Sequence, residues 1–182
     1  MNSEVLDVDM LAFERGSSNT KQAVVDGVMK SLETGFVYTS HDMSQDFLDE
    51  VYGMLGEFFS KSTPQKETAK AEGTNGQRGY TGLLVETAAI SDVPDWKEML
   101  NWGKDIPTGH PLKKRYPHRF FNNVFPEDLV PGITGTLEKF HDQVLDLQLR
   151  FLRIIASGLK ASETFFDSFV PGGATLTRAI NY

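Results

Sequence analysis

Three features are missing from this sequence, and each absence excludes a class of protein. The chain has no cysteine, so it contains no disulfide, no thiolate nucleophile and no cysteine-ligated zinc or iron–sulfur site. No apolar run reaches the roughly 18 residues that a membrane-spanning helix needs. Basic residues number 18 against 25 acidic ones, and the resulting net charge of −7 argues against a nucleic-acid surface.

The N-terminal sequence Met1-Asn2-Ser3-Glu4 lacks the basic start and apolar stretch of a secretory signal, so none is expected. The composition is 40% hydrophobic, 24% charged and 11% aromatic, which is typical of a globular domain with a real core. A chain of 182 residues fits one domain or part of a larger one. We therefore expect a soluble, cytoplasmic protein with no membrane or nucleic-acid partner.

Complete catalytic motifs are also missing. None of the four histidines lies in a His-x-Asp, His-x-His or His-Glu-x-x-His pattern. Glu138 and His141 have the spacing of half a di-iron site, but such a site needs a second copy, so we interpret them as the polar face of a helix. Neither a Gly-x-Ser-x-Gly elbow nor a phosphate-binding loop is present. The sequence predicts no catalytic residue and no metal ligand within this chain.

The local patterns predict a mixture of helices and strands. In the first part of the chain they predict a strand at 5–9, a helix at 17–35, a strand at 36–39 and a helix after Ser44. A short helix is predicted from Pro64. It carries Lys66, Glu67 and Lys70, and most of its surface is expected to be solvated. A glycine-rich loop at 72–79 precedes an extended segment at 83–85. Residues 92–131 contain six prolines and no strong periodicity, which predicts an irregular loop that lines or covers a site.

The clearest element follows. Apolar side chains from Ile133 to Ile154 recur at steps of four and three, which predicts an amphipathic helix at 132–158, about 39 Å long. A short helix after Ser162 and a strand at 174–182 complete the chain. Arg178 lies within this last, apolar strand, where a guanidinium should find a carboxylate. It either binds a carboxylate ligand, or lies on the solvent face of the strand or pairs with a local acid.

The order of several short motifs resembles a known family. The motifs are Leu6-Asp7-Val8-Asp9, Gly35-Phe36-Val37-Tyr38, Phe58-Phe59, Pro64 to Lys70, Arg78-Gly79-Tyr80, Asp95-Trp96-Lys97-Glu98, the long helix, and Leu176-x-Arg178-x-x-x-Tyr182. Together they are similar to the N-terminal half of isopenicillin N synthase-like, iron(II)- and 2-oxoglutarate-dependent oxygenases. The similarity runs over residues 4–182. The ethylene-forming branch is the most similar in the stretch from Gly79 to Trp96.

This resemblance implies an α+β fold, namely the N-terminal helices and first strands of a double-stranded β-helix, or jelly roll, with the helix at 132–158 as its backing helix. We expect residues 1–182 to form a single incomplete domain. Its first part, 1–131, is a region of helices and strands with the irregular loop 92–131. Its second part, 132–182, holds the long helix, the short helix and the first core strand. The family's iron ligands and its 2-oxoglutarate-binding arginine are expected beyond Tyr182, so we expect the chain to be a piece of a longer protein.

The resemblance also implies iron(II) and 2-oxoglutarate as cofactors, with dioxygen and a small molecule as partners. Tyr182 matches a position that contacts 2-oxoglutarate, whereas Arg178, Glu86 and Thr87 match positions that contact the substrate. If Glu86 binds an amine and Arg178 a carboxylate, the substrate is an amino acid or a metabolite derived from one. Three alternatives remain open: a truncated relative without iron chemistry, a non-catalytic binding module, and an iron oxidase that does not use 2-oxoglutarate.

Overall fold

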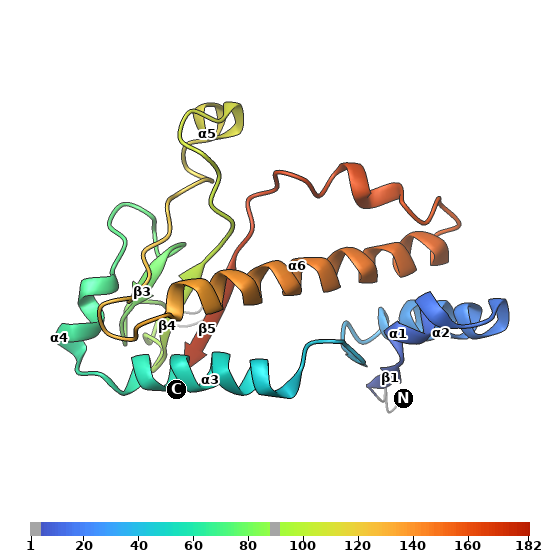
Figure 1. Ribbon diagram of the computed structural model, residues 1–182, viewed down its shortest axis with the longest axis horizontal. Coiled ribbons are helices and arrows are strands. Elements are labelled where there is room, and N and C mark those ends of the chain that lie inside the picture. The colour runs from blue at the N-terminus through green and yellow to red at the C-terminus, as the bar shows by residue number, and fades with distance from the viewer. Residues whose placement is uncertain (1–4, 88–91) are drawn as a thin grey trace. The chain divides into compact units, whose positions relative to one another are not determined.

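A computed structural model describes residues 5–87 and 92–182 (Figure 1). The described residues form both helices and strands, which confirms the predicted α+β class. They divide into two compact units. The first contains the residues up to Ser44 and Gln143–Gly173, and the second contains Gln45–Asp142 and Ala174–Tyr182. The expectation of a single incomplete domain stays a prediction. The absence of a secretory signal was predicted from residues 1–4, which lie outside the described ranges.

The first unit begins with two short parallel strands. Strand β1 (Leu6–Val8) pairs with β2 (Val37–Thr39), with Leu6 opposite Val37. Between them lie α1 (Met10–Arg15) and α2 (Ser18–Ser31). The hydroxyl of Ser17 accepts a hydrogen bond from the backbone N–H of Thr20, as the predicted cap requires. Helix α1 was not predicted. In the sequence Asp9 completes the alternating pattern of a strand, but in the structure its carboxylate caps α1 by accepting a hydrogen bond from the N–H of Ala12.

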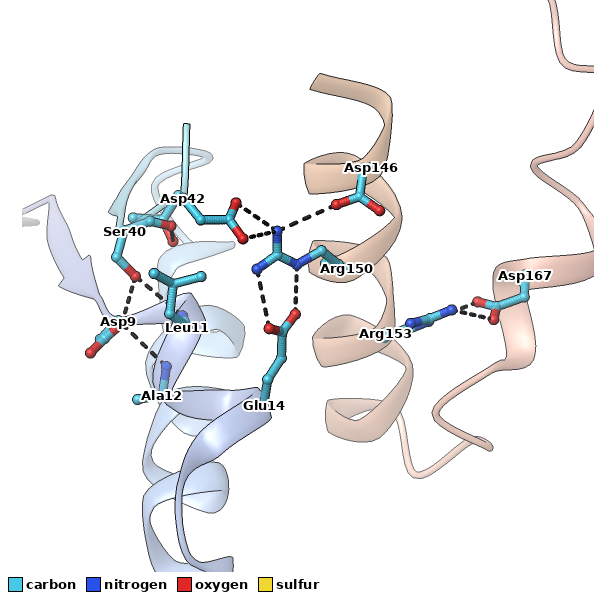
Figure 2. Close-up of polar contacts among 11 residues, drawn as sticks. Asp9, Leu11, Ala12, Glu14, Ser40, Asp42, Asp146, Arg150, Arg153 and Asp167 are labelled. Atoms are coloured by element: carbon cyan, nitrogen blue, oxygen red, sulfur yellow. Dashed lines mark hydrogen bonds and ion pairs between the residues drawn. The ribbon is translucent and has the colours of Figure 1, made fainter. Parts of the chain in front are cut away.

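Apolar residues of α1 and α2 pack against the later part of α6 (Ile133–Gly158) within the first unit. Figure 2 shows the ion pairs beside this core. Arg150 of α6 donates from Nε and Nη2 to both carboxylate oxygens of Glu14, at 2.6 and 3.1 Å. Its Nη1 atom bonds Asp42 at 2.9 Å and approaches Asp146 at 3.3 Å. A second arginine, Arg153, binds Asp167 within the 3₁₀ helix η2 (Phe165–Ser168).

The second unit contains an antiparallel sheet in the order β3-β4-β5, formed by Gly79–Thr81, Glu98–Trp102 and Thr177–Asn181. Its helical segments are α3 (Gln45–Ser60), α4 (Thr63–Lys66), the 3₁₀ turn η1 (Glu67–Ala69), α5 (Pro111–Arg115) and the start of α6. The buried face of α3, with Phe47, Val51, Leu55 and Phe58, packs in one core with Leu100 and Trp102 of β4 and Leu137 of α6. Trp102 donates its indole N–H to the carbonyl of Leu137, at 3.0 Å. The predicted helix at 132–158 is thus confirmed.

Three local predictions were wrong. The segment 92–131 is not wholly irregular, because it holds α5 and the central strand β4, whose five residues are all buried. Residues 83–84 form a turn rather than part of an extended segment, and Leu84 has a left-handed backbone with φ of 62°. Lys66 is buried instead of solvated, since only 6% of its surface is exposed. For Lys66 and for β4 the reason is the same: partners distant in sequence determine the environment of these residues.

Within the ranges that the structure describes, we find no helix with the length and apolar character needed to cross a membrane.

Candidate functional site

The candidate site lies on the face of β5 that turns away from the core. Side chains alternate between the two faces of a strand. Thr177 and Ala179 face inward, where Thr177 bonds His141 and Ala179 packs on the apolar core. Arg178, Ile180 and the following Tyr182 alternate to the other side, and Ile180 and Tyr182 are 45% and 89% exposed. The structure therefore places Arg178 and Tyr182, two predicted site residues, on one face of the same strand.

Arg178 is held by two partners from other parts of the second unit. Its Nε atom donates to Oδ1 of Asn101 in β4, at 2.9 Å. Its Nη2 atom lies 3.7 Å from Oε1 of Glu86, and each of these two side chains is one-third exposed. Arg178 and Glu86, predicted separately as substrate contacts, are thus brought together. An ion pair this open to water contributes only about 0–1 kcal/mol, so either group remains free to bind a ligand.

Glu86 is shared between two cations. Its Oε2 atom lies 3.2 Å from Nζ of Lys97, which also pairs with Asp95 at 2.9 Å. The hydrogen bonds that Lys97 donates, first to Asp95 and then to Glu86, raise the pKa of Lys97, so this cation stays charged. The backbone N–H of Asp95 donates to the carbonyl of Glu86, which fixes the two segments together. A ligand amine at Glu86 must therefore compete with Lys97.

Thr87, the third predicted substrate contact, lies next to Glu86 but is exposed. It forms an isolated antiparallel bridge with Pro94. Its side chain has no hydrogen bond to Arg178, Glu86 or any other part of the chain that the structure describes. The structure thus brings Glu86 and Arg178 together, whereas Thr87 lies at the edge of the candidate site, near the turn at residues 83–84.

A buried polar network lies under this face. The carboxylate of Glu98 accepts hydrogen bonds from Nζ of Lys66 at 2.9 Å, from the hydroxyl of Tyr80 at 2.6 Å and from the amide of Asn181 at 3.0 Å. Burial alone would raise the pKa of Glu98, but the three donors outweigh it and the pKa is lowered. Burial, followed by the bond to Glu98, raises the pKa of Tyr80. The network ties the end of β5 to β3, β4 and α4.

This network explains three of the motifs that carried the family resemblance. Lys66 comes from the Pro64 to Lys70 segment, Tyr80 from Arg78-Gly79-Tyr80 and Glu98 from Asp95-Trp96-Lys97-Glu98. The sequence reasoning did not predict that they meet. No local pattern in the sequence marks them as buried partners, because the three residues lie in separate segments that only the fold brings together. The network positions Asn181 and, through it, the end of the strand that carries Arg178 and Tyr182.

His141, which the sequence analysis placed on the polar face of the long helix, is buried, with 2% of its surface exposed. Its Nδ1 atom lies 2.6 Å from the hydroxyl of Thr177, and its Nε2 atom lies 2.9 Å from that of Thr175. Burial lowers its pKa, and the nearby Asp142 only partly opposes this effect. The neutral ring with two hydroxyl partners has a structural role at the start of β5.

We tested whether residues of this chain fit an iron ion. Within residues 5–87 and 92–182, no group of three or more histidine, aspartate or glutamate side chains is arranged to hold a metal. His141 has both ring nitrogens engaged by threonines, and His110 caps α5 by accepting from the N–H of Leu112. The described residues do not fit an iron site, and the absence of a metal ligand from the whole chain stays a prediction.

A family match and several relatives were found among known proteins. Residues 5–128 match the family described as non-haem dioxygenase in morphine synthesis N-terminal. Azadirone synthase LFS of Melia azedarach is 30% identical over 142 residues, or 74% of this chain and 40% of that protein. The 2-oxoglutarate-dependent dioxygenase caaD of Aspergillus niger is 26% identical over 183 residues, or 98% of this chain and 55% of that protein. The chain spans about half the length of the curated relatives it matches.

A solved structure supports the fold. A protein of the 2OG-Fe(II) oxygenase family from Caulobacter crescentus superposes with a TM-score of 0.83 at 24% identity, covering 100% of this chain and 57% of that one. The expected fold, the N-terminal helices and first strands of a jelly-roll oxygenase, is confirmed. The ethylene-forming branch is not specified by these relatives and stays a prediction. Because the family match extends over more than half of the sequence, this chain belongs to the non-haem dioxygenase N-terminal family.

Proposed function

We propose that this chain provides the N-terminal part and the substrate-facing strand of an iron(II)- and 2-oxoglutarate-dependent dioxygenase that oxidises a small molecule. One observation carries the proposal: the similarity to such oxygenases covers 98% of the chain by sequence and 100% by structure. A match of this extent includes α6, the sheet and β5 together, rather than one short motif. The proposal includes a cytoplasmic location and a partner that is neither nucleic acid nor membrane, and the net charge of −7 supports the exclusion of nucleic acid.

The residues of this chain bind the substrate and 2-oxoglutarate and orient them. Tyr182 contacts 2-oxoglutarate, and Arg178 binds a carboxylate of the substrate while Glu86 receives an amine. Thr87 contributes a hydroxyl at the edge of the same surface. The 3.7 Å separation of Arg178 and Glu86 supports this assignment, because an α-amino acid presents its two charged groups a similar distance apart. The substrate class is therefore an amino acid or a metabolite derived from one.

Iron(II) and 2-oxoglutarate supply the oxidising chemistry in enzymes of this kind. The residues described in this chain do not fit the metal, so no step of that chemistry is assigned to them. Their contribution is to aim the substrate, to hold its charges, and to keep β5 in place through the Glu98 network.

The test is the consumption of 2-oxoglutarate and the formation of succinate by the whole protein, with iron(II) and a panel of amino acids. We expect one or more amino acids to stimulate turnover, and Arg178→Ala and Glu86→Ala to raise the apparent KM for that substrate by about ten-fold or more, the equivalent of one charge-assisted hydrogen bond. Arg115→Ala, which removes an exposed charge from α5, is the matched control. Unchanged apparent affinity in both site variants would contradict the substrate assignment.

The same assay separates the alternatives. An iron oxidase of the related type would consume dioxygen in the presence of substrate without consuming 2-oxoglutarate. A binding module or a truncated relative would show neither reaction and would not retain iron after dialysis. Either result would overturn the proposed activity.

A further inference from the structure

Arg78 is a buried cation with no carboxylate in contact. Only 2% of its surface is exposed, at the start of β3. Its Nη1 atom donates to the carbonyl of Gln77 at 2.7 Å and its Nη2 atom to the carbonyl of Thr175 at 3.2 Å. Its Nε atom is buried without a hydrogen-bond partner, and within the described residues it forms no ion pair. The two carbonyls orient the guanidinium but do not neutralise its charge.

The setting of Arg78 is tight and desolvated. A Cβ atom added to Gly103 would lie only 2.5 Å from Nη2 of Arg78, so the guanidinium lies directly against the end of β4. Burial lowers the pKa of Arg78, and the charge of Asp105 opposes this effect without contacting the side chain. Burial of a charge without an ionic partner is costly, and a bound anion would relieve that cost.

Arg78 lines a pocket of about 390 Å³ together with two further arginines. The other polar residues of its lining are Asn75, Gln77 and Thr175, and no aspartate or glutamate lines it. Arg178 enters from β5, held by Asn101. Arg119 enters from the segment after α5 with an exposed side chain that has no ion pair in the part of the chain that the structure describes. Three arginines thus line one pocket large enough for a small ligand.

We infer that the pocket formed by Arg78, Arg119 and Arg178 is an anion-binding subsite that holds an acidic group, a carboxylate or a phosphate, of the small-molecule substrate. Guanidinium groups bind both anions through paired, charge-assisted hydrogen bonds. The link to the substrate rests on the proposed function, since Arg178 belongs to both sites. The binding of an anion does not depend on it. The subsite extends the carboxylate contact of Arg178 toward Arg119 and Arg78 and selects substrates with an acidic group.

The test is calorimetric titration of the protein, without iron or 2-oxoglutarate, with inorganic phosphate in one arm and acetate in the other. Chloride replaces the ligand at constant ionic strength in the reference run. We expect at least one of the two anions to bind saturably, with a Kd in the range of about 1–10 mM, and to raise Tm. The anion that binds more tightly, phosphate or acetate, identifies the acidic group that the subsite prefers.

Arg119→Gln is the main variant, because its exposed side chain can be removed without disturbing the fold, and it should weaken binding by about five-fold or more. Lys114→Gln removes one positive charge from α5, outside the pocket, and should change the Kd less than two-fold. Equal effects of both variants, or no binding beyond chloride in either arm, would overturn the inference. Anion binding without 2-oxoglutarate turnover by the whole protein would leave the subsite standing and reject the proposed function instead.

Discussion

Lys66 and Glu98 form a buried ion pair in which Nζ lies 2.6 Å from Oε2, and their side chains are 8% and 5% exposed. The lysine also donates to the carbonyl of Phe59, at 3.0 Å, and the glutamate accepts from Tyr80 and Asn181. Every charge in the pair is therefore surrounded by partners. Such a pair adds little net stability over an apolar pair of the same size, but the loss of one member leaves the other uncompensated.

Substitution of either member of this ion pair should therefore lower the stability of the fold strongly. We expect Lys66→Met to lower the free energy of unfolding by about 3–5 kcal/mol, since Glu98 would remain buried without its cation. Urea unfolding followed by circular dichroism measures this loss. Lys61→Met is the control, because Lys61 pairs with Glu57 at the surface of α3, and it should cost less than about 0.5 kcal/mol. Similar losses in the two variants would show that the buried pair does not stabilise the sheet.

Gly79 is a second sensitive position in the same region. It has φ of 70°, and a Cβ atom there would lie 2.4 Å from the carbonyl oxygen of Ala69. Gly79→Ala should therefore cost more than the roughly 1–2 kcal/mol of a left-handed backbone alone. Gly73→Ala separates the two effects, since Gly73 has φ of 74° but no neighbour within 4 Å. Equal thermal shifts for both variants would mean that the contact with Ala69 relaxes freely.

His141 should make stability depend on pH. Burial lowers its pKa below the usual 6.5, so below that value the folded chain binds fewer protons than the unfolded chain. The free energy of unfolding should then fall as the pH drops from 6.5 toward the folded-state pKa. His141→Gln should cost about 1–3 kcal/mol near neutral pH through lost buried hydrogen bonds, and the difference from the parent should narrow toward pH 5. His118→Gln, at an exposed position, is the control for loss of an imidazole and should cost less than about 0.5 kcal/mol near neutral pH.

The longer helices of this chain, α2, α3 and α6, were predictable because each carries its signal in its own residues, whereas the short α1 and α5 were missed. In α6 the apolar spacing predicted bounds that agree with Ile133–Gly158, and α3 begins at Gln45, directly after the predicted cap residue Ser44. Strand β4 was missed for the opposite reason. All five of its residues are buried, so it shows no alternation. Glu98 and Asn101 make it look polar, and their partners lie far away in sequence.

The candidate site was only partly predictable, for the same physical reason. Arg178 attracted attention as a cation in an apolar strand, and the structure places Glu86 beside it. Arg78 and Lys66 were not predicted to be buried, because no local pattern distinguishes a buried cation from a solvated one. Each is buried beside a partner that the fold brings close: Arg78 donates to the carbonyl of Thr175, and Lys66 pairs with Glu98.

Arg150 offers a test of the first unit. Its side chain is only 11% exposed and bonds Glu14 and Asp42, each through both carboxylate oxygens, while Asp146 lies one helical turn away (Figure 2). These charge-assisted bonds raise the pKa of Arg150, and they join α6 to α1 and to the segment after β2. Arg150→Met should therefore lower the free energy of unfolding by about 1–3 kcal/mol.

Arg153→Met is the matched control for this prediction, since Arg153 lies on the same helix but is 36% exposed and binds a single carboxylate, that of Asp167. We expect it to cost less than about 1 kcal/mol. The loss in Arg150→Met should persist at about 0.5 M salt, because a largely buried guanidinium is screened less than an exposed one, whereas the smaller loss in Arg153→Met should shrink. Equal costs and equal salt dependence in the two variants would show that the Arg150 pairs behave as ordinary surface contacts. A greater cost for Arg150 would establish that the two sides of the first unit are held by a fixed ionic cluster as well as by its apolar core.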